Sequence, residues 1–282
     1  MTLSLQQIID GIHPVNHVAL EKARARTAQL VMPPRALGRL HAIGEQLSGI
    51  QGTLRPQVRG KAVLVMAGDH GIVAEGISAF PQAVTGAMIQ TFLAGGAGIN
   101  AIARQVGAEV WVADMGIIPD LEAASVANGG RLLVRKVGPG TANFARGPAM
   151  RPEQAYKAIL TGFELASSLF DRGIDLLGTG DMGIGNTTAS AAIGAAITGK
   201  SIADMVGPGT GIDDAGIQRT RLNQVTASDP GLVGFWQMDQ NLEDASPMKN
   251  HGQASGSVQF VEVSHQAKRQ QSLKIEKGTA YL

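Results

Sequence analysis

The sequence contains no cysteine, and only 4% of its 282 residues are aromatic. The absence of cysteine excludes disulfide bonds and cysteine-ligated metal sites, and it is typical of proteins from a reducing compartment. The low aromatic content does not exclude a core, because 44% of the residues are hydrophobic. We therefore expect a soluble protein of the cytoplasm.

An excess of one charge and a long apolar run are also absent. The 24 basic and 23 acidic residues leave a net charge of +1, which gives no reason to expect nucleic acid or an anionic membrane as a partner. No apolar run approaches the roughly 20 residues of a membrane-spanning helix. Residues 1–10 lack the basic and apolar regions of a signal peptide. We therefore expect no nucleic-acid partner and no membrane.

Glycine, by contrast, is abundant, with 37 of 282 residues, which is about twice its average usage. These glycines lie in loops between short apolar runs that alternate with helical patterns. Strands are expected at residues 61–67, 109–114, 131–137 and 174–178, and helices at 16–31, 36–49, 81–92, 98–106, 152–171, 189–197 and 213–227. This alternation predicts an α/β fold with a parallel sheet, whose ligands bind beyond the carboxyl ends of the strands.

The first candidate site is the loop Gly-Thr-Gly-Asp-Met-Gly-Ile-Gly-Asn-Thr-Thr at residues 178–188, between the fourth strand and a helix. Glycines let the backbone approach an anion closely, and the amides at the start of a helix attract phosphate. Thr187 and Thr188 can add hydroxyl donors. The loop therefore indicates a phosphate cradle, although a tight turn between strand and helix would explain the same residues.

A second loop, residues 206–214, again places glycines and a threonine before a helix, with Asp213 or Asp214 as the N-cap. Two such loops suggest a phosphorylated ligand held from two sides, and two ordinary connections are the alternative. Neither loop ends in the Gly-Lys-Ser/Thr of a P-loop. No strand ending in an acidic residue follows the first loop at the spacing of a dinucleotide fingerprint.

Three expected strands lead into acidic residues, which are Asp69 (followed by His70), Asp114 and Asp181. Their shared position at one edge of a parallel sheet favours a site there. Each acid alone could form a turn or a cap, and His70 could be a buried histidine without a functional role. No spacing of His, Asp and Glu is typical of a metal site, and no Gly-x-Ser-x-Gly nucleophile elbow occurs.

Several motifs of residues 1–228 occur in the order and spacing of one enzyme family. They are residues 33–40, 67–71 with 75–78, 81–85, 92–100, 140–143 with 147–150, 180–188 and 209–214. On these motifs the chain resembles the nicotinate-nucleotide–dimethylbenzimidazole phosphoribosyltransferases of cobalamin assembly. The combination is far more specific than either glycine loop alone.

The resemblance implies a glycosyltransferase that moves phosphoribose from nicotinate mononucleotide to 5,6-dimethylbenzimidazole. The products would be α-ribazole 5′-phosphate and nicotinate. It also implies a Rossmann-like parallel sheet with flanking helices and a small helical N-terminal subdomain that includes residues 1–50. A homodimer and the absence of a cofactor are further implications. We expect residues 1–228 to form this α/β domain.

The resemblance further implies which residues form the site. Residues 180–188 and 207–211 would hold the phosphate and ribose, and residues 78–88 would line the benzimidazole pocket. Asp181, where the family often has Glu beside the ribose, is the candidate catalytic residue. The candidate binding residues are Ser78, Phe80, Pro81, Met88, Gly180, Met182, Gly183, Asn186, Thr187, Thr188, Gly207, Gly209, Thr210 and Gly211.

The chain departs from the family pattern at three places. The family's general base is a glutamate in a Ser-Ala-Glu segment, and no part of this sequence matches that segment, because the resemblance ends near Val225. We therefore expect a sheet shorter than the family's. Pro208 stands where arginine or a similar residue is usual, and Thr220 stands where lysine is usual. The resemblance therefore assigns no residue of this sequence to the role of general base.

Residues 229–282 follow a different pattern. Short strand-like segments occur at residues 232–238, 257–263, 272–275 and 279–282, without a helical pattern. This tail resembles the start of a concanavalin-like (laminin-G-like) β-sandwich, but four short segments cannot build two facing sheets. Two further hypotheses follow: a catalytically inactive nucleotide-binding protein joined to a partial glycan-binding sandwich, or a junction of unrelated coding sequences near residue 228.

Overall fold

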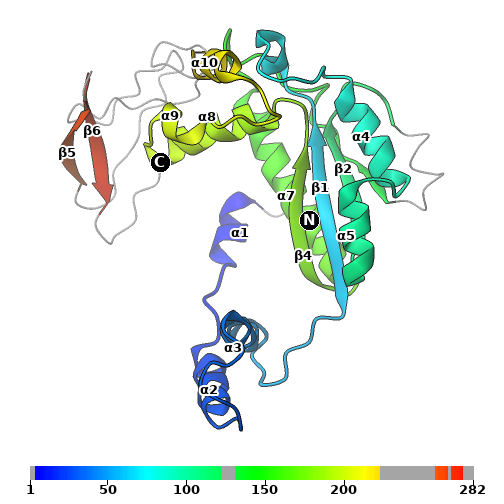
Figure 1. Cartoon of the computed structure of the whole chain (residues 1–282), viewed down its shortest axis with the longest axis vertical. Coiled ribbons are helices and arrows are strands. Elements are labelled where there is room, and N and C mark those ends of the chain that lie inside the picture. The colour runs from blue at the N-terminus through cyan, green and yellow to red at the C-terminus, as the bar shows by residue number, and fades with distance from the viewer. Residues whose placement is uncertain (1–3, 122–130, 223–257, 266–267, 276–282) are drawn as a thin grey trace. The chain divides into compact units, whose positions relative to one another are not determined.

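The computed structural model describes residues 4–121, 131–222, 258–265 and 268–275 (Figure 1). Strands and helices alternate through most of residues 60–198, which confirms the predicted α/β fold. The elements in chain order are α1 (Leu5–Asp10), α2 (His17–Ala28), α3 (Arg39–Gln51), β1 (Gly60–Gly68), the 3-10 helix η1 (Gly71–Glu75), α4 (Val84–Leu93), α5 (Gly98–Val106), β2 (Glu109–Gly116), β3 (Leu132–Val134), α7 (Pro152–Asp171), β4 (Ile174–Met182), α8 (Asn186–Thr198), α9 (Ile202–Met205), α10 (Asp214–Leu222), β5 (Val258–His265) and β6 (Lys268–Ile275).

Four strands form one parallel sheet in the order β3-β2-β1-β4. β2 and β3 are paired in parallel, with Val112 opposite Leu132. These two residues belong to a buried cluster with Ala67 of β1 and Ile89 of α4, and both α4 and α5 contact β2. Continuous burial of aliphatic side chains is what a covered parallel sheet requires.

Most predicted elements are confirmed, and α7 has the bounds that its periodicity predicts. The main correction concerns β4, which the sequence predicts to end at residue 178 but which continues to Met182. Residues 178–182 of the predicted cradle are therefore extended backbone, and the turn begins at Gly183. Gly180 lies within this strand beside Val65 of β1, where a Cβ would make only an ordinary contact at 3.7 Å. The short helices α1, η1 and α9 are not predicted from the sequence, because a helix of six residues or fewer is too short to show a helical period.

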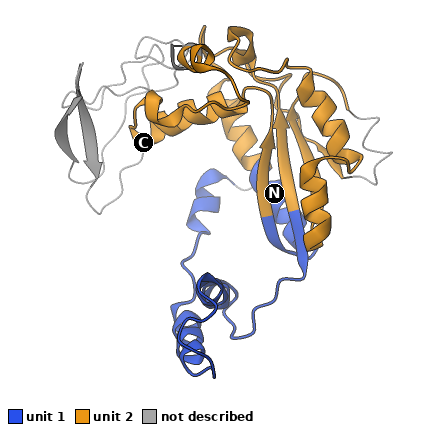
Figure 2. Cartoon of the chain, in the orientation of Figure 1, with its two compact units in different colours: residues 1–62, 162–177 blue, residues 63–161, 178–282 orange. Residues whose placement is uncertain are grey.

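The chain divides into two compact units (Figure 2). Unit 1 comprises residues 1–62 and 162–177, and unit 2 comprises residues 63–161 and 178–282. In unit 1, α2 packs on α3, and the buried residues of α3 include His41 and Glu45. Arg35 Nη1 donates to Glu45 Oε1 at 3.1 Å, which compensates in part for the burial of this carboxylate.

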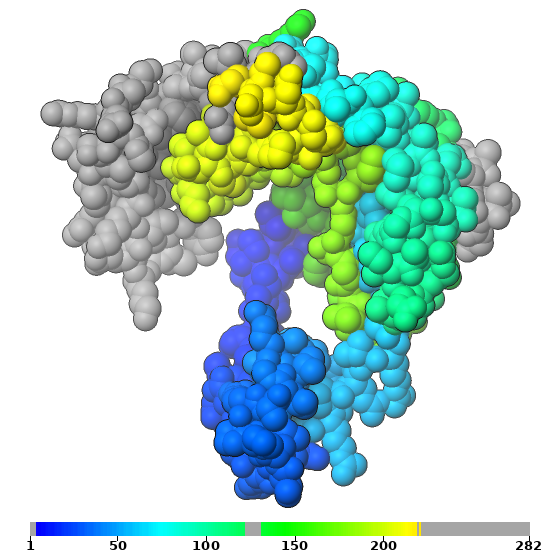
Figure 3. Space-filling view, viewed as in Figure 1, coloured from blue at the N-terminus to red at the C-terminus, as the bar shows by residue number. Residues whose placement is uncertain are grey.

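The outer side of the same two helices is apolar in part. Val18 of α2 and Leu40 of α3 are each 64% exposed, and Figure 3 shows the two helices in blue. The helix pair thus turns polar side chains inward and some aliphatic ones outward, against the usual distribution.

Helices α4 and α5 together span Val84–Val106, which contains an 18-residue window with a mean hydropathy of 1.2, enough by length and composition alone to cross a membrane. The expectation that no apolar run approaches that length is therefore wrong. The stretch is interrupted, because α4 ends at Leu93 and α5 begins at Gly98. Both helices contact β2, as helices that cover a parallel sheet do.

The tail contains an antiparallel hairpin of β5 and β6, with Val258 opposite Ile275. The strands predicted at residues 257–263 and 272–275 are thus confirmed. The segments predicted at residues 232–238 and 279–282 lie outside the described residues.

Within unit 1, one carboxylate joins the starts of β1 and β4. Asp175 Oδ2 accepts the amides of Arg59 at 2.8 Å and Gly60 at 3.1 Å. These two hydrogen bonds favour the ionised form and lower the pKa of the Asp175 carboxyl. The bonds connect residues more than 100 positions apart in the chain, so they fix the register of the two strand starts.

We expect Asp175→Asn to lower the melting temperature at pH 7, because a neutral oxygen replaces a charged acceptor of two amides. A carboxyl whose pKa is lowered by folding stabilises the protein above its unfolded value of about 3.9, and this stabilisation is lost as the pH falls through the folded value. Thermal unfolding followed by circular dichroism should therefore show the deficit shrinking below about pH 4. Asp171→Asn, at the exposed end of α7, is the control, and an equal deficit at every pH would contradict the assignment.

Candidate functional site

Two buried carboxylates lie at the carboxyl ends of β1 and β2. Asp69 is 2% exposed and Asp114 is fully buried. Asp114 Oδ1 accepts the amides of Gly116 at 3.0 Å and Ile117 at 2.9 Å, and Asp69 Oδ2 accepts the amide of Ile118 at 2.8 Å. Three successive amides, from the last residue of β2 to the second residue of the loop that follows, are thus fixed by two strand ends. Asp114 thus has the turn-forming role that the sequence left open, whereas Asp69 binds a segment that is 49 positions away in the chain.

Each of these carboxylates keeps one buried oxygen, Asp69 Oδ1 and Asp114 Oδ2, without a hydrogen bond from the described residues. Lys136 Nζ lies 3.6 Å from Asp114 Oδ2 and donates to the carbonyl of Pro119 at 2.9 Å. Burial raises the pKa of the Asp114 carboxyl, while the Ile117 amide and the Lys136 charge oppose that rise. Lys136 thereby joins the segment after β3 to the loop after β2.

His70 follows β1 and lies against the turn after β4. A Cβ at residue 183 would meet the carbonyl oxygen of Gly68 and would lie 2.9 Å from His70 Nε2, so glycine is required at this close approach. Burial lowers the pKa of the His70 imidazole, and the carboxylates of Asp69 and Asp181 oppose that shift. Burial therefore favours the neutral form of the ring, which lies beside the candidate phosphate turn.

The turn between β4 and α8 is held from two sides. The buried hydroxyl of Thr85 in α4 accepts the amide of Ile184 at 3.0 Å. Asn186 Nδ2 donates to Asp181 Oδ2 at 2.6 Å. No described acceptor takes the amides of Gly185 and Thr187 at the start of α8. Free amides at a helix N-terminus, together with the helix dipole, suit an anion.

The second glycine loop contacts the first. A Cβ at Gly209 would lie 3.2 Å from Thr187 Oγ1. On its other side, Thr210 Oγ1 accepts the amide of Ala79 at 3.2 Å and lies 3.3 Å from Ser78 Oγ. The structure therefore brings together three segments that the resemblance assigned to one site. Asp213 Oδ1 accepts the amide of Gly216 at 2.8 Å, as predicted for the N-cap of α10.

The other candidate binding residues differ in exposure. Phe80 is 51% exposed, whereas Thr188 is only 3% exposed and is therefore turned away from solvent. Met182 packs against the buried clusters that contain Ala67 and Val65. The remaining positions are Pro81 and Met88 before and within α4, Gly180 in β4, and Gly207 and Gly211 in the second loop. Roles in ligand binding stay predictions for all these residues.

Glu75 was not assigned a role from the sequence. Its Oε1 accepts Asn143 Nδ2 at 2.6 Å and Arg146 Nε at 3.0 Å. The hydrogen bond from Asn143, with a further contribution from Arg146, lowers the pKa of the Glu75 carboxyl. Next to these bonds, Ile72 and Phe144 belong to one buried cluster. Glu75 and Asn143 each lie in a motif of the resemblance, residues 75–78 and 140–143. Those motifs were the feature of the sequence that could have indicated this pair.

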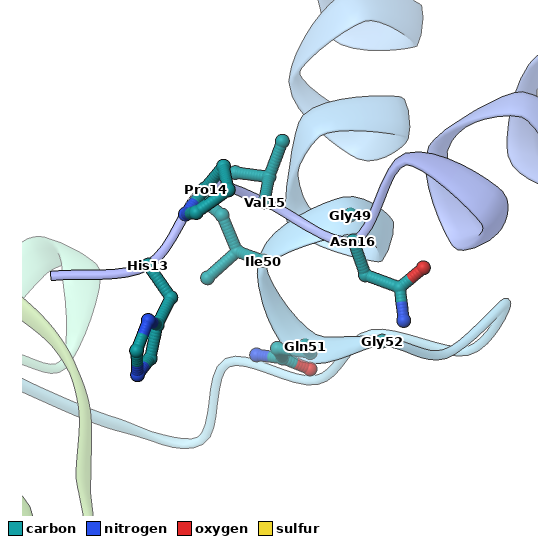
Figure 4. A pocket seen from close by; sticks show the side chains of 8 residues that line it. All are labelled: His13, Pro14, Val15, Asn16, Gly49, Ile50, Gln51 and Gly52. Carbon is teal, nitrogen blue, oxygen red and sulfur yellow. The ribbon is translucent and has the colours of Figure 1, made fainter. Parts of the chain in front are cut away.

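A pocket of about 630 Å³ in unit 1 contains none of the predicted site residues (Figure 4). Two of its side chains already have partners: Asn16 Oδ1 accepts the amide of Ala19, and Gln51 bonds with the backbone of Gln57. We therefore place the candidate site at the strand ends of unit 2. Across the described ranges, no group of three or more His, Cys, Asp or Glu residues could hold a metal ion. The pocket is lined by His13, Pro14, Val15, Asn16, Gly49, Ile50, Gln51 and Gly52.

Comparison with known proteins agrees with this arrangement. A family model described as phosphoribosyltransferase matches residues 12–227, which include both glycine loops. The chain is 48% identical over 215 residues to the nicotinate-nucleotide–dimethylbenzimidazole phosphoribosyltransferase of Roseiflexus sp. (strain RS-1), covering 76% of this chain and 60% of that protein. It is 44% identical over 230 residues to the protein of that name from Pseudomonas putida (strain KT2440), covering 78% and 64%.

A solved structure gives the same result. The crystal structure of CobT from Thermus thermophilus matches with a TM-score of 0.69 at 47% identity, over 73% of this chain and 60% of that one. The chain thus spans about 60% of the length of the curated relatives first matched.

We expect Gly183→Ala to destabilise the protein by at least about 2 kcal/mol, because the new methyl group would overlap backbone and the His70 ring. Urea unfolding measures the difference. Gly147→Ala is the control, since a Cβ at residue 147 meets no atom within 4 Å. Equal stability of the two variants would show that the close approach at residue 183 is wrong.

We expect the His70 imidazole to titrate below the ordinary histidine pKa of about 6.5, and Asp181→Asn to lower that pKa further, because it removes a carboxylate that favours the charged ring. The neutral ring belongs to the folded state, so folding stability should fall as the pH drops below about 6.5. Titration of the histidine ring protons by NMR in both proteins checks the shift. A higher pKa in the variant would refute the proximity of His70 and Asp181.

Proposed function

This chain belongs to the phosphoribosyltransferase family whose model matches residues 12–227, and on that basis we propose that it transfers phosphoribose from nicotinate mononucleotide to 5,6-dimethylbenzimidazole. The products are α-ribazole 5′-phosphate and nicotinate, in the assembly of the cobalamin lower ligand. Relatives that are 44% and 48% identical carry the name of this reaction.

One observation supports the proposal most directly. The start of α8, the second glycine loop and residues 78–80 are in contact, through Gly209 near Thr187 and through Thr210 at Ala79. The resemblance assigns the first two segments to the nucleotide and the third to the benzimidazole. A transfer between two bound substrates requires such neighbouring subsites, because the reacting atoms must be held close together.

The proposed chemistry divides between these elements. The free amides of Gly185 and Thr187 at the N-terminus of α8 receive the phosphate. Loss of nicotinate leaves positive charge on the ribose ring, and the Asp181 carboxylate, oriented by Asn186, stabilises that charge. Attack by the benzimidazole nitrogen then forms the new glycosidic bond.

The benzimidazole must also lose a proton, so a general base is required near its pocket. The resemblance implies a glutamate in a Ser-Ala-Glu segment for this role, and this sequence has no matching segment. Formation of product by this chain would therefore mean that one of its own residues accepts the proton.

We further propose that the protein acts as a homodimer in the cytoplasm. The homodimer rests on the resemblance to the family, and the compartment rests on the absence of cysteine. The alternative of an inactive remnant joined to a glycan-binding sandwich is not favoured, since the matched relatives are named as enzymes.

The decisive test incubates the purified chain with nicotinate mononucleotide and dimethylbenzimidazole and detects α-ribazole 5′-phosphate by mass spectrometry. We expect product, with a turnover about 100-fold lower in Asp181→Asn because that variant lacks the stabilising charge. Thr187→Val should weaken nucleotide binding about five-fold through loss of one hydroxyl donor.

Asp171→Asn provides the control for removal of an exposed charge outside the site. A folded chain that binds the nucleotide and yields no product would restrict the proposal to binding. Unchanged turnover in Asp181→Asn together with unchanged affinity in Thr187→Val would overturn the site.

A further inference from the structure

Thr210 joins two segments that are predicted to bind different substrates. Its Oγ1 accepts the amide of Ala79 at 3.2 Å and lies 3.3 Å from Ser78 Oγ, which itself accepts the amide of Phe80 at 3.2 Å. One of the two hydroxyls donates to the other, so both hydroxyls are occupied by contacts within the protein. The link spans 131 positions of the chain, and its geometry therefore depends on the tertiary fold.

The loop that carries Thr210 also touches the candidate phosphate turn. Gly209 leaves space for Thr187, since a Cβ at residue 209 would lie 3.2 Å from Thr187 Oγ1. A continuous series of contacts therefore leads from the start of α8, through residues 209 and 210, to Ser78 and Ala79. A phosphate that holds the second loop in place also holds the hydrogen bond at Ala79, and a segment that is already ordered loses less entropy when a second ligand binds.

We propose that Thr210 is a positioning residue that couples the two subsites, so that nucleotide bound at the glycine loops increases the affinity of residues 78–88 for the benzimidazole. The inference rests on the proposed function and adds an energetic link between its two substrates. Thr210 acts through Ala79 and Ser78 rather than by contacting the benzimidazole. Coupling of this kind is reciprocal, so the benzimidazole increases nucleotide affinity by the same factor.

The expected size of the coupling factor follows from the hydrogen bond between Thr210 and Ala79. A single net hydrogen bond between uncharged groups corresponds to about a five-fold change in an equilibrium constant. We therefore expect the dissociation constant of dimethylbenzimidazole to fall about five-fold at saturating nicotinate mononucleotide.

Isothermal titration of the full chain with dimethylbenzimidazole, with and without nicotinate mononucleotide, measures this factor, and the reverse titration checks reciprocity. Thr210→Val keeps the shape of the side chain and removes the hydroxyl, so its coupling factor should fall to about one. Thr210→Ser restores the hydroxyl and should restore the coupling. Thr198→Val, which removes a hydroxyl bonded to the Gly194 carbonyl in α8, is the matched control and should keep the wild-type factor.

The outcomes separate the inference from the proposed function. Binding of both substrates to the wild type with a coupling factor of one overturns the inference and leaves the proposed function in place. Full coupling in folded Thr210→Val, or loss of coupling in Thr198→Val, also overturns the role of Thr210. Failure of the wild type to bind either substrate overturns the proposed function as well.

Discussion

Two carboxylates buried at neighbouring strand ends support the rest of this structure. Asp69 and Asp114 would be costly to bury as unpaired charges. One oxygen of each instead accepts amides, three in succession at the end of β2 and the start of the next loop, and Lys136 lies beside Asp114. The loop, two strands and the segment after β3 are thereby tied at one point. These hydrogen bonds thus hold the loop after β2 at the edge of the sheet on which the candidate site is built.

At the same edge of the sheet, the backbone of the turn after β4 lies in close contact with the backbone at the end of β1. Gly183 lies against the Gly68 carbonyl and the His70 ring, and the adjoining turn is fixed by Thr85 and by the contact between Asp181 and Asn186. The amides at the start of α8 are therefore oriented before any ligand arrives. A site prepared in this way loses little free energy to reorganisation when charge develops.

More of the fold than of the candidate site can be predicted from the sequence. α7 is predicted with its observed bounds because a long amphipathic helix shows several turns of a single period. The end of β4 is not predicted, because glycines favour loops locally and the pairing of β4 with β1 joins residues that are distant in the sequence. The glycine loops indicate an anion site, yet the bond between Thr210 and Ala79 joins distant residues and has no local signal. The exposed fraction of a predicted binding residue such as Thr188 likewise depends on tertiary packing.

The discontinuity of unit 1 has a consequence for synthesis on the ribosome. Its helices α2 and α3 emerge early, but residues 162–177 follow only after residues 63–161, an interval of roughly 5 to 20 s at ordinary translation rates. During that interval the amides of Arg59 and Gly60 lack their Asp175 acceptor, and β1 can pair with β2 on one side while β4 is still missing on the other. Nascent chains of this protein thus spend seconds with one edge of β1 unpaired, and a chaperone that shields exposed strand edges would raise the yield of folded molecules.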